Sequence, residues 1–131
     1  MTDGADDVVT LTLPAQPAYI RVARLVGAGM ASDLDFDIER LDDVRLAIGE
    51  ACSLAVRSGA DTIELRYRRQ QGRLEVQGDT PAAFATIDDA DGSLTELVRQ
   101  ILTVACSEHQ LAADGGGPLS FWLAFDAAHG R

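Results

Sequence analysis

Long apolar runs are missing from this sequence, and its first residues do not show the pattern expected of a secretory leader. No apolar segment approaches the roughly 20 residues that a helix needs to span a bilayer. The first residues, MTDGADD, are acidic, and they lack the basic segment and apolar stretch of a secretory signal peptide. We therefore expect a cytoplasmic protein that does not insert into membranes.

Basic residues are also scarce. The chain has 11 Lys and Arg against 21 Asp and Glu, which gives a formal net charge of -10. Binding of DNA or RNA depends on clustered cations that neutralise phosphates, so this balance argues against a nucleic-acid partner. An acidic surface favours a basic protein partner, although solubility alone explains the charge equally well.

Cysteine is limited to two residues, and the common metal and nucleotide motifs are incomplete. Cys52 and Cys106 fit no CxxC spacing, and each lies in an apolar helical pattern, so we expect buried, reduced thiols. The acidic segment 33–37 is followed by Ile38, where an EF-hand requires glycine. The glycines at 115–117 lack the Lys-Ser/Thr of a phosphate-binding loop. No metal site is predicted.

Hydrophobic periodicity predicts a single domain over residues 1–131. Alternating apolar and polar residues indicate strands, and apolar residues three and four apart indicate helices. Gln71-Gly72 is expected to form a hairpin turn, Gly59 to follow a helix end, and 80–92 to form a loop. The fold class expected is α+β, a two-layer sandwich with helices on one face of a mostly antiparallel sheet. The strands are expected at 8–13, 62–68, 73–77, 109–113 and 119–125, and the helices at 17–30, 39–58 and 94–105.

The segment LDDVRLAIGEACSLAV, residues 41–56, resembles the N-box helix of GHKL-type ATPases. Within this superfamily, the segment resembles specifically the RsbW and SpoIIAB serine kinases that act as anti-sigma factors. Those proteins read Asp-x-x-x-(Leu/Ile)-Ala-x-x-Glu-Ala-x-x-Asn-Ala, and the order of their elements matches the one expected here. The resemblance implies the Bergerat fold of histidine-kinase-like ATPases. The residues in register are Asp42, Leu46, Ala47, Glu50, Ala51 and Ala55.

The resemblance implies a catalytic role for Glu50, as the group that orients or activates the attacking nucleophile. A helix glutamate with no such role is the alternative reading, and a vestigial role lies between the two. The family places an Asn four residues later, whose amide oxygen holds magnesium. Leu54 stands at that position and offers no oxygen ligand, so no metal residue is predicted.

The family's second motif, Asp-x-Gly-x-Gly, supplies a carboxylate to the adenine amino group. Its match here is the stretch 76–84, in which Asp79 is the candidate cofactor-binding residue, one position out of register, and both glycines are missing. Of the later Gly-x-Gly motif only Gly92 remains. The resemblance thus implies ATP with Mg²⁺ as cofactor, and we predict that this binding is weak or lost.

The function expected from the resemblance is that of an anti-sigma factor, which sequesters a sigma factor and is released by an anti-anti-sigma factor. Arg24, 26 residues before Glu50, stands where the family has a partner-contacting arginine, and a solvated helix arginine is the equal alternative. Family analogy also suggests a homodimer. An active serine kinase that phosphorylates the anti-anti-sigma factor is the second hypothesis, so enzymatic activity stays open. A regulatory module that binds neither sigma factor nor ATP is the third.

Overall fold

The computed structural model describes residues 7–81, 93–113 and 118–127. All the strands and helices expected from the sequence are present there, with bounds that differ by at most two residues. The expected loop is described only at Thr80 and Pro81, and the turn at 115–117 lies outside the described residues. The elements in chain order are β1 (Asp7–Pro14), α1 (Pro17–Ala31), α2 (Ile38–Arg57), β2 (Thr62–Gln70), β3 (Arg73–Asp79), α3 (Ser93–Ala105), β4 (Glu108–Ala112) and β5 (Ser120–Asp126).

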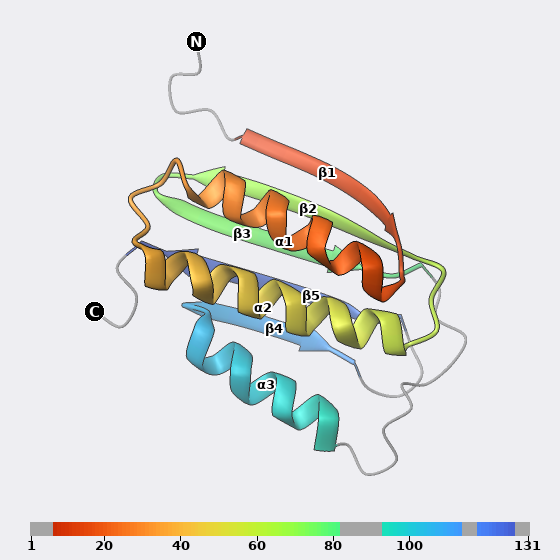
Figure 1. The fold of residues 1–131 in the computed structure, drawn as a ribbon. Helices are drawn as coiled ribbons and strands as arrows, with labels where there is room; N and C mark the ends of the chain where they lie inside the picture. Colours follow the sequence, from red (N-terminus) through yellow and green to blue (C-terminus); the bar gives the residue numbers. More distant parts are fainter. Residues whose placement is uncertain (1–6, 82–92, 114–117, 128–131) are drawn as a thin grey trace.

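The strands form one sheet in the order β1-β2-β3-β5-β4, and each neighbouring pair is antiparallel. Figure 1 shows the three helices side by side on one face of this sheet, with β1 at one edge and β4 at the other. Because successive side chains of a strand point to opposite faces, every second residue is buried under the helices. The α+β two-layer sandwich predicted from the sequence is confirmed.

The hairpin between β2 and β3 shows how the sequence determines which side chains are buried and where the chain turns. Ile63, Leu65 and Tyr67 of β2 are buried under the helix layer, while the residues between them face outward. The turn residues Gln71 and Gly72 have positive φ angles of 51° and 77°. Two successive left-handed residues give a two-residue hairpin that matches the right-handed twist of the strands, so the predicted turn is confirmed.

Helix α2 lies at the centre of the helix layer. The carboxylate of Asp37 caps its first turn by accepting a hydrogen bond from the backbone N–H of Arg40 at 2.7 Å. Gly59 follows the helix end with a φ of 82°, a left-handed conformation that glycine adopts without strain, as the sequence predicted. The inward face of α2 packs on the sheet. Its fully buried residues are Val44, Ala47, Ile48, Ala51, Cys52, Leu54 and Ala55.

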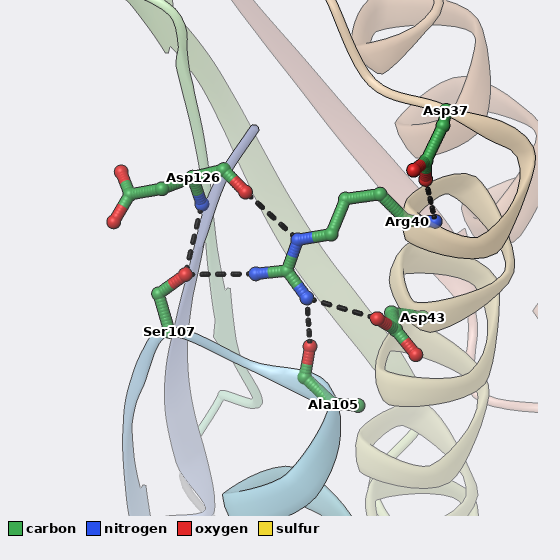
Figure 2. A network of polar contacts seen from close by, with 6 residues as sticks. All are labelled: Asp37, Arg40, Asp43, Ala105, Ser107 and Asp126. Atoms are coloured by element: carbon green, nitrogen blue, oxygen red, sulfur yellow. Dashed lines mark hydrogen bonds and ion pairs between the residues drawn. The ribbon is translucent and has the colours of Figure 1, made fainter. Parts of the chain in front are cut away.

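A buried arginine joins α2 to the other end of the fold (Figure 2). Arg40 donates to the carbonyl oxygens of Asp126 at 2.8 Å and Ala105 at 2.7 Å, and to Ser107 Oγ at 2.7 Å. Its Nη1 also forms an ion pair with Asp43 at 3.0 Å. The guanidinium therefore connects the first turn of α2 with the end of α3, the start of β4 and the end of β5.

We predict that Arg40→Met lowers the free energy of unfolding by about 3–5 kcal/mol, because it leaves buried carbonyls and the Asp43 carboxylate without their donor. Arg45→Met is the matched control on the same helix. Its exposed ion pair with Asp42 should contribute no more than about 1 kcal/mol. Urea denaturation of both variants measures the difference, and equal losses would show that the Arg40 network adds nothing beyond a surface pair.

Candidate functional site

Glu50 lies in the middle of α2 and is half-buried. With Asp43, Ala47 and Leu54 it forms a row of residues three and four apart, on the side of α2 that packs against α3. Within the described residues, the carboxylate of Glu50 has no hydrogen bond or ion pair, so no such contact fixes its position.

Leu54 follows Glu50 by one helical turn and has no exposed surface. It belongs to the core cluster of the domain, and its side chain fills the place where the family's N-box carries asparagine. The sequence contains no asparagine at all. The structure therefore places an apolar side chain one helical turn after Glu50, at the position of the family's asparagine.

The end of β3 is the second part of the candidate site. Val76 and Gly78 point toward the helix layer, whereas Gln77 and Asp79 point to the open face of the sheet. A Cβ atom at Gly78 would overlap the ring of Phe121, because that ring lies directly over the glycine. The helix-facing position at the end of β3 is thus filled by an aromatic ring.

Asp79 and Glu50 are not brought together by the fold. Asp79 is half-buried on the open face, where Gln77 Nε2 donates to its carboxylate at 3.3 Å, while Glu50 lies in the helix layer. Thr80, the next residue, is buried and pairs with Leu119 through its backbone N–H and its hydroxyl. Gly92 of the third motif lies outside the described residues.

Arg24 is an exposed residue of α1 whose side chain reaches across to α2. A Cβ atom at Gly49 would lie 3.3 Å from Cδ and 3.2 Å from Nη1 of Arg24, so the absence of a side chain at Gly49 makes room for the arginine. Gly49 immediately precedes Glu50. The sequence offered no signal for this contact, because glycine within a helix has several explanations.

The two cysteines are buried, as predicted, and carry no bond to each other. Burial raises the pKa of both thiols to about 12, although Arg24 beside Cys52 and Arg40 beside Cys106 act in the opposite direction. Both therefore stay protonated and unreactive at neutral pH.

In the described ranges, no three His, Cys, Asp or Glu side chains are grouped to hold a metal ion. None of the helices there combines the length and apolar character that a membrane crossing requires.

Comparison with known families gives a match over residues 13–108 to the histidine kinase-like ATPase domain. The chain belongs to this family. Its antiparallel sheet with helices on one face is the Bergerat fold, and the resemblance predicted from the N-box segment is confirmed.

Similar curated proteins bear the name serine-protein kinase RsbW. The protein from Bacillus subtilis (strain 168) is 31% identical over 75 residues, which cover 53% of this chain and 47% of the relative. The protein from Listeria monocytogenes serotype 4b (strain F2365) is 36% identical over 76 residues, or 54% and 48% of the two chains. The matched part thus spans about half the length of these relatives.

We predict that Leu54→Asn lowers the free energy of unfolding by about 1–3 kcal/mol, because it buries an amide among apolar side chains. Leu46→Asn is the control on the same helix, where the side chain is 47% exposed and the loss should be smaller. Chemical denaturation compares the two. If Leu54→Asn leaves the free energy of unfolding unchanged, polar groups or water near position 54 satisfy the amide. Position 54 would then not lie in a purely apolar environment.

Proposed function

We propose that this protein is an anti-sigma factor that sequesters a sigma factor in a partner-switching system, with ATP binding weak or lost. Release occurs when an anti-anti-sigma factor competes for it. The histidine kinase-like domain and the RsbW relatives support the class of protein. The fully buried Leu54 at the metal-ligand position of the N-box is the observation that carries the loss of ATP binding.

The described residues do not fit Mg-ATP. Magnesium takes oxygen ligands in a nearly octahedral arrangement, and the chain carries leucine where the family's amide oxygen lies. The ring of Phe121 covers the inner side of Gly78, and Asp79 faces away from the helix layer. These two features support the proposal that ATP binding is weak or lost.

An active serine kinase is the second candidate, and the position of Glu50 favours it. This carboxylate is half-buried on the N-box helix and, in the described part of the chain, has no structural partner. Phosphoryl transfer, however, depends on a metal ion that neutralises the charge developing on the phosphate oxygens. A carboxylate without a metal ligand beside it does not supply that stabilisation, so the binding function is the better supported one.

Calorimetric titration with Mg-ATP tests the proposed loss directly. Leu54 replaces the family's metal-binding asparagine, and the ring of Phe121 covers the end of β3 at Gly78. We therefore expect no saturable binding heat at micromolar concentrations of Mg-ATP. The RsbW protein of Bacillus subtilis, titrated under the same conditions, serves as the positive control. A micromolar isotherm for this protein would contradict the proposal and favour the kinase.

The exposed surface of α1 supports a partner site at Arg24. The helix sequence PAYIRVARLVGAGMA contains two arginines and no acidic residue, in a chain of net charge -10. The side chain of Arg24 lies over Gly49 of α2, and Leu25 beside it is 71% exposed. A local excess of positive charge next to an apolar side chain suits a partner segment that is acidic and apolar.

We predict that Arg24→Glu weakens binding of the sigma factor recovered with the native protein. The loss should be about 2–5 kcal/mol if the arginine forms a partly desolvated ion pair, felt mainly as faster dissociation. Arg66→Glu makes the same charge change on the open face of the sheet and should leave the affinity unchanged. Circular dichroism first confirms that both variants fold. If Arg24→Glu and the native protein bind the sigma factor with equal affinity, α1 is not part of the interface with the sigma factor.

A further inference from the structure

The open face of the sheet carries the only tryptophan of the chain. Trp122 lies on β5, on the face that no helix of the described residues covers (Figure 1). Leu123 beside it is fully buried under the helices, so Trp122 points to the opposite side of the sheet. Trp122 is half-buried, and its indole N–H has no hydrogen bond within the described residues. A large ring outside the core, with an unused donor, is typical of a residue that contacts a partner.

Two adjoining hollows of the surface lie beside Trp122. The first, of about 190 Å³, is lined by Arg66, Arg68, Glu75, Gln77 and Trp122. The second, of about 260 Å³, shares Gln77 and Trp122 with the first and extends to Gln110 of β4. Gln77 and Gln110 lie opposite Trp122 on the two neighbouring strands, so the hollows follow one row across the sheet. Each hollow is smaller than the roughly 300–1,000 Å³ of a small-molecule pocket and suits one side chain of a bound segment better.

The acidic residues of the open face gather away from the first hollow. Arg73 pairs with three of them, at N–O distances of 3.7 Å for Glu75, 2.6 Å for Glu108 and 3.1 Å for Asp126. Its Cζ atom lies 5.9 Å from the ring centre of Trp122, so this cluster also supports one side of the indole. Glu64 and Asp79 lie opposite each other in another row of the sheet and do not line the hollow. One end of the face is thus acidic.

The first hollow itself has an excess of positive charge. Arg66 is exposed and, in the part of the chain that the structure describes, forms no hydrogen bond or ion pair. Thr10 and Gln77, opposite Arg66 on β1 and β3, are uncharged. Arg68 lines the same hollow, where the one carboxylate is that of Glu75. In a chain of net charge -10, such a local excess of positive charge attracts an acidic group.

We infer that the open face binds an extended acidic segment of a different protein, which crosses the strands at Trp122. A carboxylate of the segment accepts a charge-assisted hydrogen bond from Arg66 in the first hollow. An apolar side chain of the segment packs on the indole ring, and its main chain bonds with the amides of Gln77 and Gln110. Because Glu108 lies beyond the second hollow, the acidic residues of the segment lie at β2 and its uncharged residues at β4.

This surface is separate from the sigma-factor site proposed at α1. Helix α1 lies in the helix layer, and the open face is on the opposite side of the sheet (Figure 1). A segment bound at Trp122 therefore leaves α1 accessible, and the domain can hold a second protein together with its sigma factor. The two proposals fail independently, because the first depends on Arg24→Glu and sigma-factor affinity and the second on Arg66→Glu and peptide affinity.

Tryptophan fluorescence tests the site, because Trp122 is the only residue of its kind. The probe is a capped octapeptide in which leucine alternates with aspartate in the first half and with serine in the second. This peptide should change the emission of the native protein in a saturable way at submillimolar concentrations. Arg66→Glu should weaken its binding by about tenfold or more, because repulsion replaces a charge-assisted hydrogen bond. Arg45→Glu, the same charge change at an exposed site of α2, should leave the affinity for the peptide unchanged.

Circular dichroism first confirms that both variants fold. Trp122→Phe keeps an aromatic ring but loses the indole N–H, and the anisotropy of a fluorescein-labelled peptide should show weaker binding to it. No saturable change with the native protein, or equal affinity for a peptide with lysine in place of aspartate, would overturn the inference. The same emission change with inorganic phosphate alone would assign the hollow to a small anion and contradict it. Displacement of the peptide by the sigma factor would show that the two surfaces are not separate, and would also contradict it.

Discussion

The arrangement of the helix layer depends on the buried guanidinium of Arg40. The exposed fraction of Arg40 is only 3%, yet its nitrogens donate to two backbone carbonyls, one hydroxyl and one carboxylate. Its Cζ atom lies 5.5 Å from the ring centre of Phe125. A buried charge is tolerated only when its donors are satisfied in this way. Because α2 carries Glu50 and Leu54, the same contacts set where the candidate site lies relative to α3 and β5.

Under the proposed loss of ATP binding, core packing takes the place of part of the family's ligand-binding surface in the candidate site. Leu54 belongs to the hydrophobic core, and the ring of Phe121 lies over Gly78. Both features add apolar contacts, which stabilise the domain without a nucleotide. Binding a protein partner uses the outer surface, so such a domain keeps a recognition function when the chemistry of the family is lost.

The sequence predicted the elements well because their signals are local. Alternation in β2, the Gln71-Gly72 turn and the helical spacing of α2 each follow from the backbone geometry of a few residues. The Arg40 network was not predicted, since an arginine in the first turn of a helix usually faces water. The face of Asp79 was also missed, because a shift of one residue along a strand moves a side chain to the other side of the sheet. The roles of Glu50 and Arg24 came from the resemblance, because no local pattern in the sequence assigns a function to either residue.

The central claim is that this domain recognises its partner without the help of ATP. The most direct measurement is the affinity of the native protein for its sigma factor, determined with and without Mg-ATP at saturating concentration for an active RsbW protein. The account predicts the same dissociation constant in both conditions and no transfer of phosphate to an anti-anti-sigma factor. A requirement for ATP, or an affinity that rises tenfold or more when ATP is added, would contradict it.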